Sequence, residues 1–229
     1  FESPAPDAVR YRQIANEMMF LYDTQEREPL FILCCKISLL LFGDSDTSLR
    51  ILTFILSIAL IPAIYKVGKE LFGIVPGLVS AMLLAGCTDW AWSGSRGMRL
   101  ELFTLVLMPM TWAIFTDKVT DRKRHGLLLA ASTALTCAVR LTSLWFCLAG
   151  CAYAIWRRGW DTRVFAKVAG LAVLPLLPFV IYCGVKFGDP MHTANIHAKW
   201  YRNYELVGVE GGITEAQMIA DPYGGPKVS

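Results

Sequence analysis

The stretch that decides the fold runs from Gly126 to Trp156 and reads GLLLAASTALTCAVRLTSLWFCLAGCAYAIW. It contains a single charged residue, Arg140, near its centre. A helix needs about 20 mostly apolar residues to cross the hydrocarbon core of a bilayer. The stretch is therefore either one very long helix or two short spans joined by a turn at Arg140.

Basic residues in the flanking loops decide between these two structures. If the stretch is a hairpin, ten lysines and arginines in three loops fall on one side of the membrane. A single helix would move the group Arg157–Lys167 to the opposite side. Because cytoplasmic loops carry an excess of Lys and Arg, the sequence predicts the hairpin. The ten residues are Lys66, Lys69, Lys118, Arg122, Lys123, Arg124, Arg157, Arg158, Arg163 and Lys167.

With the hairpin, the apolar runs predict an all-α polytopic membrane protein with six transmembrane helices. The runs are Leu49–Val67, Ile74–Trp92, Met98–Phe115, the two arms of the hairpin, and Phe165–Lys186. We expect the segments Phe1–Ser48, Ser93–Gly97, Arg140 and Gly188–Ser229 to lie outside the cytoplasm.

The first outer loop is predicted to contain two interfacial helices. Leu30–Phe42 is apolar, but it has only 13 residues and includes Lys36, so it is too short to cross a membrane. Asp7–Tyr22 has the apolar spacing of a helix that lies on a surface. The predicted organisation is thus an outer loop at 1–48, a transmembrane domain at 49–187 and an outer tail at 188–229. Because Phe1 and its neighbours form no signal peptide, we expect the chain to begin part-way through a longer protein.

The composition supports a multi-pass protein in the cell membrane. The chain of 229 residues is 55% hydrophobic and 18% charged, against about 45–50% and about 25% for an ordinary soluble domain. So few charges do not cover the surface of a soluble protein of this size. The composition excludes a soluble enzyme, a disordered chain and a nucleic-acid binder. The seven cysteines all lie in apolar runs, and we interpret them as free buried thiols.

Arginines at the predicted outer boundary are the candidate substrate ligands. Arg140 is placed at the tip of the hairpin, and Arg96 and Arg99 lie in the neighbouring outer turn. An ionisable residue at membrane depth marks a functional site by default, and a guanidinium is well suited to bind phosphate. The alternative is that these side chains extend to the lipid headgroups.

Two carboxylates in the first outer loop are further candidates. Asp7 fits either an N-cap of the first helix or a general base beside the membrane. Glu28 fits either a second functional carboxylate or part of a solvated run of charges. Glu101, one turn into a span, is interpreted as the partner of an arginine.

Five segments, taken in order, contain short motifs. Asp7–Met18 reads DAVRYRQIANEM, Arg27–Leu30 reads REPL, and Ser95–Glu101 reads SRGMRLE. Thr136–Thr142 reads TCAVRLT, and Phe187–Pro190 reads FGDP. This ordered set resembles the GT-C class of membrane glycosyltransferases, in the branch of the aminoarabinose transferases and the dolichyl-phosphate-mannose-protein mannosyltransferases. The corresponding patterns of that branch are DExRYxxIxxEM, KPPL, SRxxRxD/E, T-K/R-G/P and FGxP.

The resemblance implies transfer of a sugar from a polyprenyl-phosphate donor to a hydroxyl- or phosphate-bearing acceptor, a lipid, protein or glycan. The transfer would occur with inversion at the non-cytoplasmic face, periplasmic or extracellular. Asp7 would be the catalytic base, and Arg10 and Tyr11 would shape the site. The donor phosphate would be held by Arg96, Arg99 and Arg140, which would stabilise the leaving group.

The sequence departs from the pattern of that branch at two positions. Ala8 replaces the second acidic residue of DE, and Glu28 replaces the first proline of PP. Ala8 removes a carboxylate that some relatives use, so no cofactor is certain from the sequence, and a divalent metal ion is the one candidate. If a divalent metal ion binds, the predicted ligands are Glu28 and His197. Two other functions stay open from the sequence, a transporter or lipid flippase and a non-catalytic membrane subunit.

Overall fold

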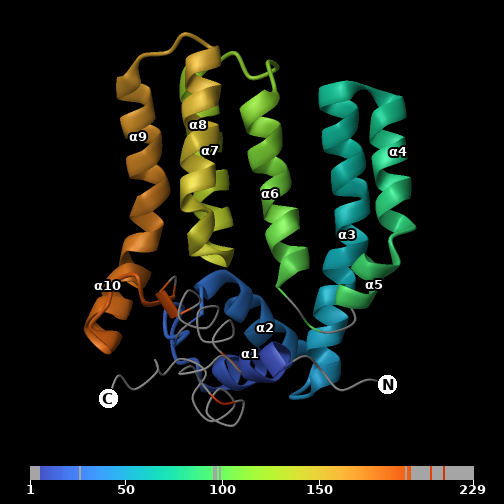
Figure 1. The fold of residues 1–229 in the computed structure, drawn as a ribbon, viewed down its shortest axis with the longest axis vertical. Coiled ribbons are helices and arrows are strands. Elements are labelled where there is room, and N and C mark those ends of the chain that lie inside the picture. The colour runs from blue at the N-terminus through green and yellow to red at the C-terminus, as the bar shows by residue number, and fades with distance from the viewer. Residues whose placement is uncertain are drawn as a thin grey trace. The chain divides into compact units, whose positions relative to one another are not determined.

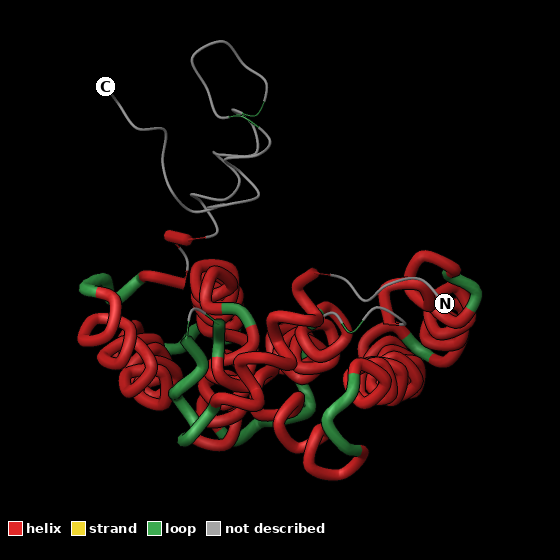
Figure 2. The backbone as a smooth tube through the Cα atoms, turned by 90° about the horizontal axis from the view of Figure 1, so that it is seen from below, coloured by secondary structure: helices red, strands yellow, loops and turns green. Residues whose placement is uncertain are grey.

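The computed structural model describes residues 6–25, 27–94, 97, 99–193, 195–196, 207 and 214. Every regular element in this part of the chain is a helix (Figures 1 and 2). Two helices precede the long ones, α1 (Pro6–Glu17) and α2 (Pro29–Phe42). The others are α3 (Asp46–Phe72), α4 (Ile74–Ala85), α5 (Thr88–Gly94), α6 (Leu100–Phe115), α7 (Arg122–Val139), α8 (Leu144–Arg157), α9 (Thr162–Val173) and α10 (Leu177–Phe187), with 3₁₀ turns η1 (Leu141–Ser143) and η2 (Leu174–Leu176).

The hairpin predicted at Arg140 is confirmed. Helix α7 ends at Val139, and Arg140 has an extended backbone with φ −152° and ψ 100°. The 3₁₀ turn η1 follows, and α8 then runs back beside α7 (Figure 1). The apolar stretch therefore forms two helices, and the single long helix is excluded.

The prediction of one helix over Ile74–Trp92 is wrong. Helix α4 ends at Ala85, and α5 begins at Thr88 after a break at Gly86 and Cys87. Glycine is among the residues least favourable in a helix interior, since fixing its backbone costs more entropy than fixing any other residue. The hydrophobicity pattern does not predict this break, because glycine and cysteine also occur within hydrophobic runs.

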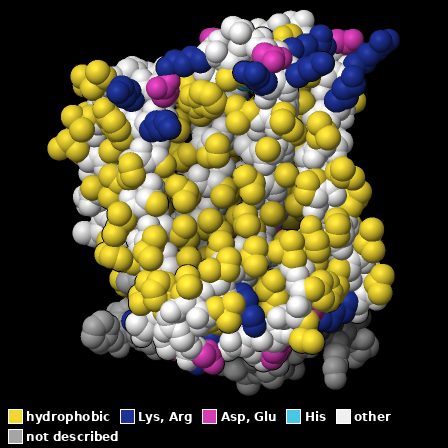
Figure 3. Space-filling view, turned by 180° about the vertical axis from the view of Figure 1, so that it is seen from behind, with side chains coloured by type: hydrophobic (Ala, Val, Ile, Leu, Met, Phe, Trp, Pro, Cys, Tyr) yellow, Lys and Arg dark blue, Asp and Glu magenta, His cyan; other side chains and the backbone are white. Residues whose placement is uncertain are grey.

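Two helical stretches, Asp46–Phe72 and Thr162–Phe187, are long and apolar enough to cross a membrane by length and composition. Shorter apolar helices are α2, α4 and α6. Large hydrophobic side chains on these helices lie exposed in a band, with charged side chains gathered at both ends of it (Figure 3). Soluble monomers rarely expose so large an apolar surface, and lipid-facing helices do. The number of six spans and their sidedness stay predictions.

Two compact units make up the chain, Phe1–Phe179 and Val180–Ser229. In the first unit, one group of buried residues joins α6, α7, α8 and α9. A second group joins α1 and α2 to the ends of three long helices through Leu49 of α3, Leu102 of α6 and Val139 of α7. We call this region the α1 end of the bundle. In the second unit, Asn195 donates a hydrogen bond to Asp189 Oδ2 at 2.7 Å.

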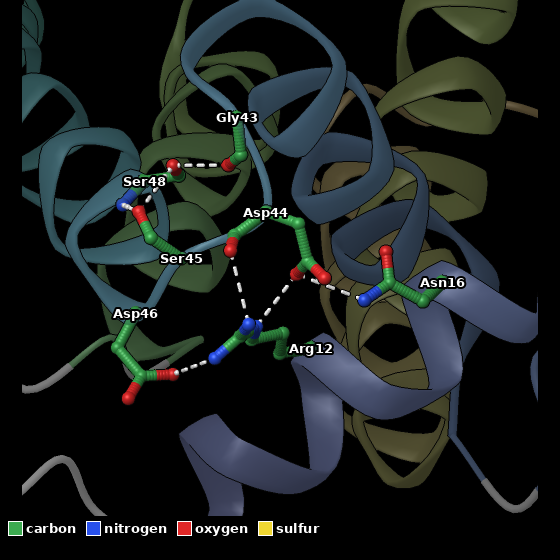
Figure 4. A network of polar contacts seen from close by, with 7 residues as sticks. All are labelled: Arg12, Asn16, Gly43, Asp44, Ser45, Asp46 and Ser48. Carbon is green, nitrogen blue, oxygen red and sulfur yellow. Dashed lines mark hydrogen bonds and ion pairs between the residues drawn. The ribbon is translucent and has the colours of Figure 1, made fainter.

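A polar network attaches α1 to the turn that precedes α3 (Figure 4). Arg12 Nε donates to Asp44 Oδ1 at 2.7 Å, and its Nη1 donates to Asp46 Oδ1 at 3.1 Å. Asn16 donates to the same Asp44 oxygen at 2.9 Å. Hydrogen bonds from Arg12 and then from Asn16 lower the pKa of the Asp44 carboxyl below its usual value. The network fixes the direction of α1 across the ends of the long helices.

Candidate functional site

The apolar face of α1 packs on α2, and this packing positions the segment that is predicted to be catalytic. Tyr11, Ile14 and Ala15 are buried on this face. The Tyr11 ring meets the Phe31 ring edge to face, with centroids 5.0 Å apart, and the guanidinium of the buried Arg27 lies 5.3 Å from the Tyr11 ring centroid. Tyr11 is therefore a core residue, and it supports the α1 end of the bundle from inside.

Glu28 connects the two arginine-bearing turns. Its Oε2 accepts a hydrogen bond from Arg99 Nη1 at 2.5 Å, and its Oε1 accepts one from the backbone N–H of Leu141 at 3.0 Å. The Glu28 side chain is 1% exposed and that of Arg99 is 17% exposed. Because one buried carboxylate binds both partners, the turn before α6 and the tip of the α7–α8 hairpin are held on either side of it.

The turn before α6 also touches α1 at the residue that follows Asp7. Gly97 has a φ of +75°, and a Cβ added to it would lie 3.1 Å from the Cβ of Ala8. A glycine allows both the positive φ and this close approach. Ala8 is itself buried, so this contact lies inside the packed α1 end of the bundle.

Replacing Gly97 by alanine is therefore expected to displace this turn from α1. A side chain at a positive φ costs roughly 1–2 kcal/mol, and the contact with Ala8 adds to that cost. We expect lower thermal stability in detergent and a several-fold loss of activity. Gly159→Ala is the matched control, since Gly159 has a φ of +62° but nothing within 4 Å of an added Cβ. Equal effects of the two substitutions would show that only the backbone angle matters.

Arg140 differs from Arg99 in its surroundings. Its side chain is exposed, its Nε donates to Thr142 Oγ1 at 3.2 Å, and its guanidinium lies 5.8 Å from the Phe103 ring centroid. Arg99 instead engages the buried carboxylate of Glu28. Of these two arginines, Arg140 is the one whose charge faces outward and is available to an anionic ligand.

The remaining predicted site residues are distributed as follows. Arg10 donates to Gln13 and Gln25, at 2.9 and 2.7 Å, on the outer side of α1. Asp7 lies in the first turn of α1, but its side chain is outside the described part of the structure, as are Arg96 and His197. The predicted convergence of Asp7 with the three arginines therefore stays a prediction.

Of the two predicted metal ligands, Glu28 is described by the structure and His197 lies outside the described residues. No group of three or more His, Cys, Asp or Glu side chains in the described part of the chain is arranged to hold a metal ion. Both oxygens of Glu28 accept hydrogen bonds from protein groups. A metal site formed by Glu28 and His197 remains untested.

Sequence reasoning did not find the role of Glu28. A solvated run of charges was one interpretation of this residue, and its burial excludes that interpretation. The one available signal was Pro29, which begins α2 and so requires Glu28 to lie at the helix boundary. Arg12 was also missed, because its two carboxylate partners lie more than 30 residues away.

Comparison with known proteins identifies a family for this chain. A family model described as dolichyl-phosphate-mannose-protein mannosyltransferase matches residues 26–182, more than half of the chain. The match includes Glu28, Arg96, Arg99 and Arg140 and begins after the segment that contains Asp7. No match was found among curated proteins or among solved structures.

The match supports the mannosyltransferase side of the resemblance, whereas the aminoarabinose transferase side stays a prediction. It also favours a glycosyltransferase over a transporter or a non-catalytic subunit. With more than half of its residues matched, an all-helical fold and an exposed apolar band, the chain belongs to the dolichyl-phosphate-mannose-protein mannosyltransferase family of membrane glycosyltransferases.

Proposed function

We propose that this protein transfers a sugar from a polyprenyl-phosphate donor to a hydroxyl- or phosphate-bearing acceptor at the non-cytoplasmic face of the membrane. The observation that carries the proposal is the bridge from Glu28 to Arg99 and to the backbone of Leu141. It holds two arginine-bearing turns beside the helix that begins with Pro6 and Asp7. A base and a phosphate site on opposite sides of a sugar are what a single displacement requires.

In the proposed reaction Asp7 is the general base. It takes the proton of the acceptor as the acceptor oxygen attacks the anomeric carbon of the donor. The bond from that carbon to the phosphate oxygen breaks on the opposite side, so the configuration inverts. Polyprenyl phosphate leaves with the electron pair of the broken bond.

The proposed phosphate ligand is Arg140, with Arg96 as a second. A guanidinium stays charged and offers paired donors to phosphate oxygens, so it stabilises the charge that develops on the leaving group. Arg99 acts here as a positioning residue, because its guanidinium binds Glu28. Arg10 and Tyr11 shape the acceptor side of the site.

The test is a transfer assay in membranes with labelled polyprenyl-phosphate sugars, in which Arg140→Gln is compared with the wild type. A hydrogen bond to a charged group contributes about 1.5–3 kcal/mol, so we expect the donor KM to rise by roughly 10- to 100-fold. Arg163→Gln is the matched control, since this arginine is 88% exposed and lies in α9 next to Asp161. An unchanged donor KM would mean that Arg140 extends to lipid headgroups instead, and an absence of transfer from every such donor would refute the proposed function.

A further inference from the structure

A cleft between α3 and α6 lies away from the residues of the candidate site. Its volume is about 460 Å³, within the range of roughly 300–1,000 Å³ found for ligand sites. Each helix lines it with one face, at spacings of three, four and seven residues. The lining residues are Ala63, Lys66, Val67 and Glu70 from α3 and Leu105, Met108, Pro109 and Trp112 from α6.

A second cavity adjoins this cleft at Trp112. It has a volume of about 440 Å³, and its lining includes Lys118, Asp121 and Arg124. The loop after α6 and the start of α7 supply these charged residues. The cleft between the helices is therefore mainly apolar, and the second cavity, beyond the ends of the helices, is lined by more charged residues.

The charged residues that line the two cavities are unequally paired. Glu70 forms an ion pair with Lys118, and Asp121 forms one with Arg124 at 3.5 Å. Lys66 precedes Glu70 by four residues, one helical turn, and so lies closer to the apolar part. Within the described part of the chain, Lys66 has no ion-pair partner.

We propose that this cleft binds an acidic glycerophospholipid, with one acyl chain between α3 and α6 and the phosphate on Lys66. A lysine at the edge of the hydrocarbon is stabilised by an anionic partner or by extending its ammonium group to the headgroup region. A lipid phosphate is an anionic partner that lies in that region. The apolar lining suits the acyl chain. Trp112, which lines both cavities, has the mixed polarity preferred at a membrane interface.

The occupant is not the proposed sugar donor. Twenty residues separate Asp46, at the α1 end of α3, from Lys66, which places the two positions about 30 Å apart along the helix. A phosphate bound by Lys66 therefore lies near the opposite end of the bundle from Arg99 and Arg140. The ten basic residues predict that this end is cytoplasmic, and that leaflet is the one rich in acidic lipids.

The first test measures lipid retention by the full-length protein in detergent with native mass spectrometry. Phosphatidylglycerol is compared with phosphatidylcholine for the wild type, Lys66→Gln and Lys69→Gln. Lys69 is the matched control, because it is exposed on the same helix, does not line the cleft and lies 5.8 Å from the Tyr65 ring centroid. We expect Lys66→Gln to lower phosphatidylglycerol retention about fivefold and Lys69→Gln to leave it unchanged.

Other results would overturn the proposal. An equal loss with both variants would indicate a general surface potential, and equal retention of the two lipids would show that the headgroup is not recognised. Displacement by polyprenyl phosphate would assign the cleft to the donor lipid instead.

A second variant tests where the acyl chain of the lipid lies, without altering the charge of the protein. Ala63→Phe places a ring in the cleft, so we expect it to reduce both phosphatidylglycerol retention and crosslinking of a photoreactive acyl chain to the peptide 105–112. Crosslinking elsewhere would overturn the placement. Because neither measurement uses sugar transfer, the outcome is independent of the proposed function.

Discussion

Replacing Asp7 by asparagine is expected to reduce turnover by roughly 10²- to 10⁴-fold, the usual contribution of a positioned general base. Asparagine has nearly the same shape but cannot take the proton of the acceptor. Donor binding should change little, because the proposed phosphate ligands lie on other segments. The measurement is single-turnover transfer from a labelled polyprenyl-phosphate sugar at saturating donor.

The matched control for this variant is Glu17→Gln. Glu17 is an exposed acid on the same helix and accepts hydrogen bonds from Gln13 and Gln25. The same chemical change there should leave turnover within about twofold of the wild type. Normal turnover of a correctly inserted Asp7→Asn protein would show that Asp7 is not the base.

Replacing Glu28 by alanine is expected to produce the largest loss of stability. The change leaves Arg99 without its carboxylate and the N–H of Leu141 without its acceptor. Removal of one partner of a buried ion pair costs about 3–5 kcal/mol, and the lower value applies here because Arg99 is 17% exposed. We expect a lower midpoint of thermal unfolding in detergent and a turnover reduced by at least tenfold.

A double-mutant cycle separates the two roles of Glu28. Glu28→Gln retains an oxygen for the N–H of Leu141 but removes the charge that pairs with Arg99. We expect it to be intermediate in stability, and the coupling energy with Arg99→Gln to be about 0.5–3 kcal/mol, as found for residues in contact. Additive effects of the two substitutions would contradict the bridge.

Much of the helical fold could be predicted from the sequence. The turn at Arg140 followed from the length of one apolar run and the distribution of basic residues, both of which are properties of the sequence alone. Helix α1 was predicted from apolar spacing over adjacent turns and α2 from a short apolar run. Their bounds differ from the prediction mainly at Glu17, where α1 ends. Hydrophobicity and helix periodicity act over a few residues, and so they can be recognised locally.

The candidate site was predicted only as a set of residue types. Asp7 and the arginines were selected because charges near a predicted membrane boundary are costly, and that argument does not say which residues meet. The structure separates Arg99, which binds Glu28, from Arg140, which is exposed. This difference depends on the neighbours of each arginine, and sequence reasoning does not reveal them.

The sequence by itself determined that this chain is helical, is suited to a membrane, and turns at Arg140. Only the tertiary structure decided that Glu28 joins two turns that lie 71 and 113 residues further along the chain. It also decided that Gly97 packs against Ala8. The physical reason is that hydrophobicity is a property of each residue, whereas a buried ion pair or a close backbone contact requires the relative positions of distant segments, which are set by the packing of the helices.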